Sequence, residues 1–299
     1  MKKFFYYIFR FTYLFVESME TFFRLLFFEN FKDYIKQKNG SSKCTSNEIV
    51  LFANGPSQKD VLNRVSTDIF FHDKDLGFVN YLGEEDIYTK VKPKYYFLAD
   101  PQFFFENHKN FPRSLLLYDR INSLTSWKMS MYVHYAYLTH FKKMNYLKNS
   151  NITIIPFHST PIKGFKFFRN ILYRNGLGDG DFRSVIQHAI YVSVHLKYKN
   201  IHLFGVDHNY FENLIVTEQN ILCNKLEHYY DKSDIKFEPA AISSGNPLTT
   251  YEFLFWHAEL FKYHHILNNH AKLMGTKIFN HTPNSFIDSY EKVTNKVIS

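Results

Sequence analysis

Residues 48–57 read Glu-Ile-Val-Leu-Phe-Ala-Asn-Gly-Pro-Ser, and this stretch decides the fold. The run 48–53 is short and almost wholly apolar, which suits a buried strand. Residues 54–57 are turn formers, and 58–65 follows with the composition of a helix. A strand, a tight glycine turn and a helix form the opening unit of an α/β sheet.

Further apolar runs alternate with helical segments along the chain. The predicted strands are 68–71, 78–82, 95–98, 152–156, 200–204 and 276–279. The predicted helices are 58–65, 112–147, 182–196 and 250–274, the last stopped by Gly275, with a final helix beginning at 283–285. This alternation predicts a doubly wound, mostly parallel, Rossmann-like sheet with helices on both faces. Residues 208–248 are polar and irregular, which predicts a lid or acceptor loop.

Composition limits the kind of partner. The 299 residues carry a formal net charge of +8, which favours a membrane surface, a nucleotide or an acidic glycan. The basic residues are scattered and no nucleic-acid motif occurs, so nucleic acid is not an expected partner. Cys44 and Cys223 give neither a disulfide framework nor a zinc site, which is typical of a cytoplasmic protein. A homo-oligomer is compatible with the sequence, which leaves the oligomeric state open.

Residues 1–38 form an aromatic-rich segment that we expect to be an amphipathic helix. Between Phe4 and Phe28 the charged residues are Arg10, Glu17, Glu20 and Arg24. The uncharged stretches, such as 11–16, are far shorter than the roughly 20 residues that a spanning helix needs. The pattern suits a helix that lies in a membrane interface, and packing on the protein's own core or a partner chain is the alternative. The composition of residues 39–47 predicts a linker, which connects this segment to a domain at 48–299.

The turn Asn54-Gly55-Pro56-Ser57 is the first candidate site. A glycine behind a strand lets the backbone approach a phosphate or ribose, and the start of the following helix favours an anion. The structural alternative is an ordinary turn with Ser57 as the helix N-cap. The fingerprint Gly-x-Gly-x-x-Gly is absent, so a dinucleotide-binding dehydrogenase is not supported.

The pair Asp179-Gly180-Asp181 is the second candidate site. Many metal-dependent glycosyltransferases hold a divalent cation and the donor diphosphate with Asp-x-Asp, because carboxylate oxygens suit Mg²⁺ or Mn²⁺. Such pairs are also frequent in loops. We favour the interpretation of Asp181 as the N-cap of the helix that follows.

His257 is the third candidate. It lies near the start of the predicted helix 250–274, just after the irregular stretch. Sugar transfer needs a base for the acceptor hydroxyl, and imidazole titrates near neutral pH. Fifteen histidines are present, and none forms the His-x-x-x-His or His-Glu-x-x-His spacing that places two metal ligands on adjacent turns of one helix face.

Taken in order, these positions resemble the bacterial lipooligosaccharide sialyltransferases of glycosyltransferase family 42, over roughly residues 49–290. The family's strand ending in Asn-Gly-Pro-Ser resembles Asn54 to Ser57. Asn80 resembles an Asn that follows in the family. Asp100-Pro101, with the stretch 103–106, resembles the family's later Asn-Pro, which aromatic residues and Glu follow.

The later motifs of the family follow in the same order. Gly205-Val206-Asp207-His208-Asn209-Tyr210 resembles its Gly-Ile-Asp-Phe-Tyr, and the helix before that strand resembles 183–198. Within that helix Ser184, next to Arg183, stands near the family's nucleotide-contacting Ser. Pro283-Asn284-Ser285-Phe286 resembles its Pro-Asn-Ser-Leu, and the catalytic His, counted back from that Pro, falls within one residue of His257.

The resemblance implies a GT-A-like, nucleotide-sugar-binding catalytic domain at 48–299 with a lid at about 208–248. It implies inverting transfer, without an essential metal or other cofactor, from a CMP-activated acidic sugar such as sialic acid, another nonulosonate or Kdo. The implied acceptor is an oligosaccharide or lipooligosaccharide of lipopolysaccharide or capsule biosynthesis. The implied location is the cytoplasm, peripheral on the inner face of the cytoplasmic membrane.

The resemblance also implies roles for single residues. His257 would be the base, and Tyr210 would assist departure of the phosphate. The implied nucleotide-binding residues are Asn54, Gly55, Pro56, Ser57, Asn80, Asp100, Pro101, Arg183, Ser184, Gly205 and Asp207, and the C-terminal motif is Pro283, Asn284 and Ser285. Asp100 stands where the family has Asn, and the family's second phosphate-contacting Tyr has no counterpart after Tyr210.

Two other functions fit the same sequence. One is a UDP- or GDP-sugar transferase that binds Mg²⁺ or Mn²⁺ through Asp179 and Asp181. The other is a nucleotide-binding or pyrophosphokinase-like protein that shares the sheet but transfers no sugar.

Overall fold

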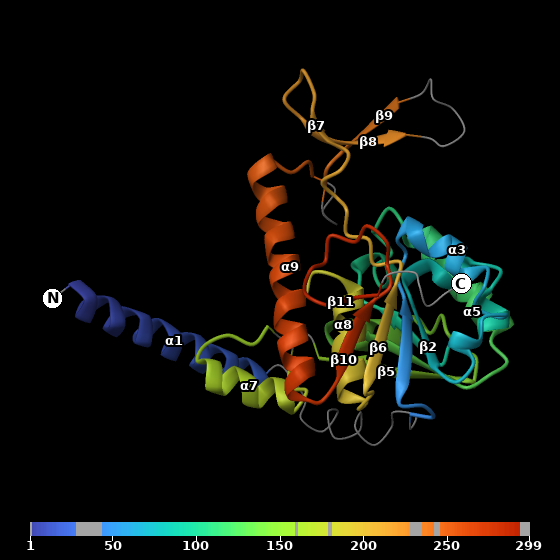
Figure 1. Cartoon of the computed structure of the whole chain (residues 1–299), viewed down its shortest axis with the longest axis horizontal. Coiled ribbons are helices and arrows are strands. Elements are labelled where there is room, and N and C mark those ends of the chain that lie inside the picture. Colours follow the sequence, from blue (N-terminus) through green and yellow to red (C-terminus); the bar gives the residue numbers. More distant parts are fainter. Residues whose placement is uncertain are drawn as a thin grey trace.

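The computed structural model of the protein describes residues 2–27, 44–158, 161–178, 181–227, 235–241 and 246–293. Within these ranges an eight-stranded sheet has the order β11-β10-β6-β1-β2-β3-β4-β5 (Figure 1). The strands are β1 (Glu48–Phe52), β2 (Asp75–Val79), β3 (Tyr95–Leu98), β4 (Met129–His134), β5 (Ile152–Phe157), β6 (Asn200–Phe204), β10 (Lys277–Asn280) and β11 (Glu291–Lys292). All neighbouring pairs are parallel. The predicted α/β class with a mostly parallel sheet is confirmed.

Helices and short 3₁₀ turns connect the strands. The α-helices of the described ranges are α1 (Lys2–Phe27), α3 (Lys59–Leu62), α4 (Tyr88–Val91), α5 (Phe111–Leu124), α6 (Leu138–Met144), α7 (Lys166–Arg174), α8 (Val185–His195) and α9 (Thr250–Leu273). The 3₁₀ turns are η1 (Pro56–Gln58), η2 (Ile69–Phe71), η3 (Asn80–Glu84), η4 (Pro101–Phe103) and η5 (Tyr135–Tyr137).

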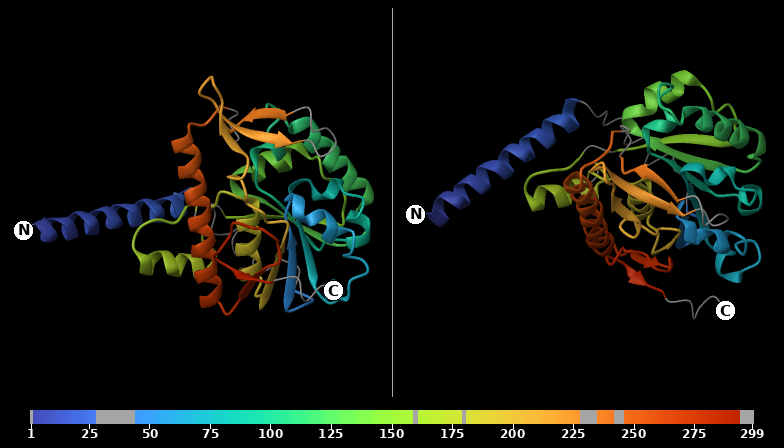
Figure 2. Two further views of the ribbon diagram at one scale, coloured as in Figure 1. Left: turned by 45° about the horizontal axis from the view of Figure 1, so that its top comes forward. Right: turned by 90° about the horizontal axis from the view of Figure 1, so that it is seen from above.

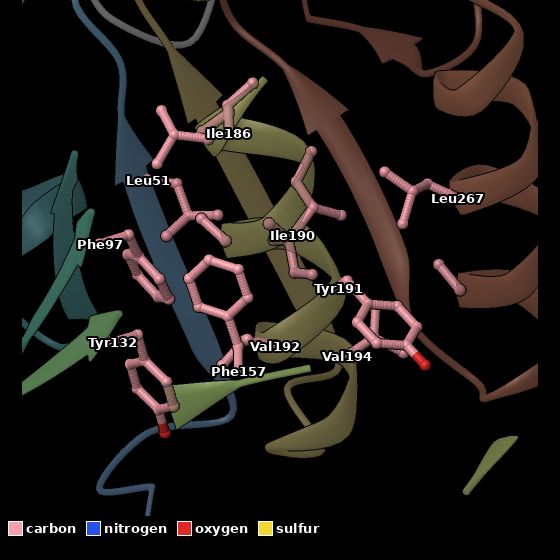
Figure 3. Packing of buried hydrophobic residues seen from close by; sticks show 14 of the residues in the cluster. Leu51, Phe97, Tyr132, Phe157, Ile186, Ile190, Tyr191, Val192, Val194 and Leu267 are labelled. Carbon is pink, nitrogen blue, oxygen red and sulfur yellow. The ribbon is translucent and has the colours of Figure 1, made fainter. Parts of the chain in front are cut away.

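β1 lies inside the sheet and is buried on both faces. Ile49 and Leu51 belong to one core cluster, together with side chains of α8 and α9. Val50 and Phe52 belong to a second cluster, together with side chains of α5 and α6. Figure 3 shows the first cluster, where Leu51 lies beside Ile190 of α8. Since successive strand side chains point to opposite faces, an unbroken apolar run is what a strand covered on both sides requires.

α9 has strong signals at both ends. Thr249 and Glu252 form a reciprocal capping box at its start. Gly275 follows the helix with a φ of +79°, the left-handed conformation that closes many helices. The predicted helix 250–274 and its stop are confirmed.

β4 was not predicted, because 112–147 has the pattern of one long helix. In the structure this range contains α5, then β4, then α6. β4 is buried on both faces, so all of its residues up to Val133 are buried and no alternation marks it as a strand. Periodicity alone does not separate such a strand from a buried helix.

Three further predictions of secondary structure differ from the structure. The strand predicted at 78–82 ends at Val79, where the turn η3 begins. Residues 69–71 form a 3₁₀ turn in place of a strand, because the Asp68 side chain accepts a hydrogen bond from the Phe70 amide. The predicted helix at 283–285 is a turn followed by residues without regular secondary structure, with Asn284 at a φ of +55°. Ser285 Oγ there donates to the Val206 carbonyl at 2.7 Å, which holds the segment against the end of β6.

The predicted lid at 208–248 contains a separate three-stranded antiparallel sheet. Its strands are β7 (Leu214–Val216), β8 (Leu222–Glu227) and β9 (Ile235–Pro239), in that order. Leu222 of β8 packs in a small cluster with Phe253 in the first turns of α9. Figure 1 shows this sheet beside the start of α9, so the segment folds against the helix that carries His257.

The last turns of α1 contact the rest of the protein, and its first turns extend away from it (Figure 2). Leu25 is buried in the first core cluster, and Thr21 is also buried. Among the described helices, none is long and apolar enough to cross a membrane. Most of the predicted linker at 39–47 lies outside the described residues.

Candidate functional site

The predicted motifs follow strands that end at one edge of the sheet. Asn54 follows β1, Asn80 follows β2, Asp100 follows β3 and Gly205 follows β6. β2 lies on one side of β1 and β6 on the other, so the chain leaves the sheet in opposite directions at this point. In open parallel sheets, ligands bind outside the carboxyl ends of the strands at such a point. This edge is therefore the candidate site.

Gly55 and Gly205 bring the loops after β1 and β6 into contact. The Gly55 amide donates to the Gly205 carbonyl at 2.8 Å. A Cβ on Gly55 would lie 1.7 Å from Asp207 Oδ2, and one on Gly205 would lie 2.6 Å from the Ala53 carbonyl oxygen. Neither position has room for a side chain, so the close approach of these loops needs both glycines.

Ser57 binds Asp207 across this contact. Its hydroxyl donates to Asp207 Oδ2 at 2.8 Å, and its backbone amide also bonds this carboxylate. Burial raises the pKa of Asp207, and the bonds from Ser57 lower it in part. The alternative of Ser57 as N-cap is wrong, because Ser57 lies inside η1 and Gln58 is the N-cap of α3.

This arrangement changes the chemistry expected of the turn. The Ser57 amide, which we expected to face an anion, already serves a carboxylate. The helix after it, α3, has only 4 residues, so its dipole adds little. The loop thus presents an acceptor, Asp207, and suits a hydroxyl or amino group better than a phosphate.

Asn80 and Asp100 form a second pair of acceptors. Asn80 Nδ2 donates to Asp100 Oδ2 at 2.9 Å, and the Tyr96 hydroxyl donates to the Asn80 carbonyl. Asn80 Oδ1 is buried without a hydrogen-bond partner among the described residues. Burial raises the pKa of Asp100, and Asn80 partly offsets this. A buried acceptor that lacks a protein partner calls for another donor, either water or a bound ligand. Pro101 begins the η4 turn behind Asp100.

Tyr210 and His257 lie ring against ring, with centroids 4.7 Å apart. His257 Nδ1 donates to the Phe253 carbonyl at 2.8 Å, which leaves the lone pair on Nε2. Burial lowers the pKa of His257, so its neutral form predominates at pH 7. Burial and the charges of Asp100 and Asp207 raise the pKa of Tyr210 to about 12. Tyr210 is thus a hydroxyl donor within the field of both carboxylates, and these groups form one site.

His208 and His264 lie behind Tyr210 and were missed as site residues. The Tyr210 hydroxyl is 3.4 Å from His208 Nδ1, and the His208 and His264 rings are 5.1 Å apart. Burial and nearby His257 lower the pKa of His208 to about 4. His264 Nδ1 is 2.8 Å from the Tyr290 hydroxyl. The seven-residue spacing of His257 and His264, which places both on one side of a helix, is the signal that could have found His264. No helical spacing points to His208, which lies in the loop after β6.

The C-terminal motif supports the loop after β6. Ser285 holds the Val206 carbonyl as described above, and the Thr282 hydroxyl accepts from the Val206 amide at 3.0 Å. The Phe286 amide donates to the Asp207 carbonyl at 3.1 Å. Pro283 and Asn284 are exposed. The motif therefore positions the backbone of Asp207 through hydrogen bonds to the loop after β6.

The N-cap of α8 is Ser184 and not Asp181, the residue predicted from the sequence. Ser184 caps this helix by accepting from the Ile186 amide, whereas Asp181 pairs with Arg183 at 2.7 Å. Ser184 lies three residues closer to the helix, where its side chain can reach the first free amides. Asp179 lies outside the described residues. Among those described, no group of three His, Cys, Asp or Glu residues could hold a metal ion.

A cavity of about 330 Å³ lies elsewhere, near the start of β2. Lys74, Lys90, Lys92 and Lys94 line it. It opens at the amino ends of the strands, where the sheet does not bring the predicted motifs together. We therefore place the candidate site at the carboxyl edge. Asn80 Oδ1, which lacks a partner among the described residues, lies there together with the side chains whose pKa values are shifted by burial.

Comparisons of the chain with protein-family models, with curated proteins and with solved structures find no match. The proposed function therefore rests on the chemistry of the site.

Proposed function

We propose that the protein is an inverting glycosyltransferase that moves an acidic sugar from a CMP donor to a bacterial surface glycan without an essential metal. The observation that carries the proposal is the contact of Tyr210 with His257 at the carboxyl edge of the sheet. It pairs a neutral imidazole that has a lone pair on Nε2 with a hydroxyl donor. Within the α/β class, the proposed fold is a doubly wound, GT-A-like variant.

The proposed reaction is a single displacement. His257 Nε2 takes the proton of the acceptor hydroxyl while that oxygen bonds the anomeric carbon of the donor. The bond from the anomeric carbon to the phosphate oxygen breaks, its electrons go to the phosphate, and CMP leaves with inversion at carbon. The Tyr210 hydroxyl donates a hydrogen bond to the phosphate oxygen that gains charge, because it stays protonated at pH 7.

The two acceptor pairs support a cytidine nucleotide. Cytosine carries an exocyclic amino group where uracil carries a carbonyl, so acceptors distinguish them. Asn80 Oδ1 and Asp100 are the proposed partners of that amino group, and Asp207 and Ser57 those of the ribose hydroxyls. Arg183 and Ser184 remain proposed neighbours of the nucleotide. The proposed place of the reaction is the inner face of the cytoplasmic membrane.

Binding of CMP is the first test. CMP is expected to raise the melting temperature by roughly 5 °C at about 100 times its Kd, while UDP at the same concentration has little effect. Equal stabilisation by UDP and CMP would contradict the assignment of the base. Transfer from CMP-activated acidic sugars is then expected to persist in EDTA. Activity lost in EDTA and restored by Mn²⁺ would instead support the metal-dependent alternative.

Tyr210→Phe is expected to lower kcat by about 10²-fold, the usual effect of losing one donor to developing charge. KM for the CMP-sugar should change little, because the bond strengthens only as the phosphate departs. Steady-state kinetics with the donor that stabilises the protein measures both. Tyr251→Phe is the control, since Tyr251 lies on α9 and is 74% exposed. An unchanged kcat in Tyr210→Phe would remove Tyr210 from the reaction.

A further inference from the structure

α1 is held to the protein by one of its faces. Ser18 Oγ accepts from the Phe165 amide and Thr21 Oγ1 accepts from the Lys163 amide, each at 3.0 Å. Leu25, four residues after Thr21, is 3% exposed. These positions recur at helical spacing, so they define the side of α1 that faces the loop before α7.

Along the side next to it, apolar residues recur every three or four positions over most of the helix. Phe4, Ile8, Phe11, Phe15, Phe22 and Leu26 are 65%, 46%, 62%, 51%, 45% and 48% exposed. This spacing gathers them on one face, about 33 Å long at 1.5 Å per residue. Exposed apolar surface of this extent marks an interaction site.

Charged residues form a narrow stripe on a third side of α1. Lys3, Arg10, Glu17 and Arg24 follow one another at intervals of seven residues, which is close to two helical turns. Glu20 pairs with Arg24 at 2.7 Å. A helix with a broad apolar face and a charged stripe lies along an interface, whereas a spanning helix needs an apolar surface all round.

α7 adds a second apolar and basic patch beside the attachment point of α1. Phe167 and Ile171, one helical turn apart, are 78% and 42% exposed. The ring of Phe165, just before α7, lies 5.2 Å from that of Phe11. The exposed basic residues of this segment are Lys163, Lys166 and Arg174, and 161–178 contains no Asp or Glu. We call the apolar face of α1 together with these α7 residues and Lys163 the basic aromatic surface.

We propose that the basic aromatic surface binds an anionic lipid bilayer, with α1 lying in the headgroup region. Aromatic and aliphatic side chains enter the interface, and the lysines and arginines contact lipid phosphates. Charge decides between a membrane and a second copy of this chain. Two such surfaces would bring the three exposed basic residues of this segment against three more, whereas an anionic leaflet attracts them. This inference deepens the proposed location at a membrane and does not depend on sugar transfer.

The test is sedimentation of the full chain with vesicles of phosphatidylcholine alone or mixed with phosphatidylglycerol. Binding to the anionic vesicles is expected to be at least tenfold tighter. Phe15→Ser with Phe22→Ser should weaken it tenfold or more, and Phe167→Ser with Ile171→Ser several-fold. Lys163→Gln with Lys166→Gln should reduce the preference for anionic vesicles by roughly 30-fold, since each of the two charges near the surface contributes about 1 kcal/mol.

Ile69→Ser with Leu116→Ser is the matched control, because both residues are exposed, by 83% and 69%, outside the basic aromatic surface. It should leave vesicle binding unchanged. The melting temperature of each variant without ligand reports folding, and its shift with CMP reports the nucleotide site, both separately from lipid binding. Equal binding to both vesicle types, or no binding, would overturn the proposal. So would self-association in solution that the α1 variant abolishes, which would assign the surface to a second copy.

Discussion

Replacing His257 with Asn is expected to lower the turnover of sugar transfer by roughly 10²–10⁴-fold, the usual contribution of a general base. Asn can place its amide near the Phe253 carbonyl, as Nδ1 of His257 does at 2.8 Å. It has no atom at the position of Nε2, so the acceptor hydroxyl loses its proton acceptor. The measurement is steady-state transfer from the CMP-sugar that stabilises the protein.

His265→Asn is the control for this substitution. The His265 side chain lies on the same helix, is 56% exposed and contacts Asp288 at the surface. It should transfer sugar at the wild-type rate. Both variants should keep the melting-temperature shift with CMP, because Asn80 and Asp100, rather than His257, are the proposed partners of the base. Undiminished transfer by His257→Asn would remove it as the proton acceptor.

The dependence of the transfer rate on pH is an independent test of His257 as the base. A base acts in its neutral form, and burial lowers the pKa of His257 below its usual value of about 6.5. The rate should therefore hold as the pH falls through 6.5 and decline only below the lowered pKa. His257→Asn should lose this acidic limb, whereas His265→Asn should keep it.

The sequence predicted the fold where local signals agree with tertiary structure. β1 has an unbroken apolar run and turn residues behind it, and α9 has Thr249 and Glu252 at its start and Gly275 at its end. It failed at β4, whose burial on both faces removes the alternation that marks a strand. It also failed at Ser285, because the hydrogen bond that holds this segment in place joins Ser285 to Val206, far away in the chain.

The same limit applies to the site. Each strand-end motif could be found alone, because glycine, asparagine and aspartate behind apolar runs are local signals. The hydrogen-bond partner of each side chain could not be predicted, because Ser57 bonds Asp207, 150 residues later in the chain. The grouping of Tyr210 with His257 depends on how α9 is placed against the loop after β6, and no local pattern encodes that placement.

Gly55→Ala is expected to destabilise the protein by about 3 kcal/mol and to abolish stabilisation by CMP. The backbone of Gly55, with φ −65° and ψ 152°, is allowed for alanine, so the conformation itself costs little. The cost comes from contact, because the new Cβ would lie 1.7 Å from Asp207 Oδ2 and 2.4 Å from the Gly205 carbonyl oxygen. One neighbour is backbone, so the loops after β1 and β6 must separate, which breaks the bond between Ser57 and Asp207.

Gly275→Ala separates this cause from ordinary glycine strain. Gly275 has a φ of +79°, and no heavy atom lies within 4 Å of the position that a Cβ would take, so alanine there meets an unfavourable backbone but no clash. Its expected cost is about 1 kcal/mol, with CMP stabilisation intact. Urea unfolding measures the first quantity and thermal shift the second. If Gly55→Ala costs no more than Gly275→Ala and still responds to CMP, the contact between the two loops does not build the nucleotide site.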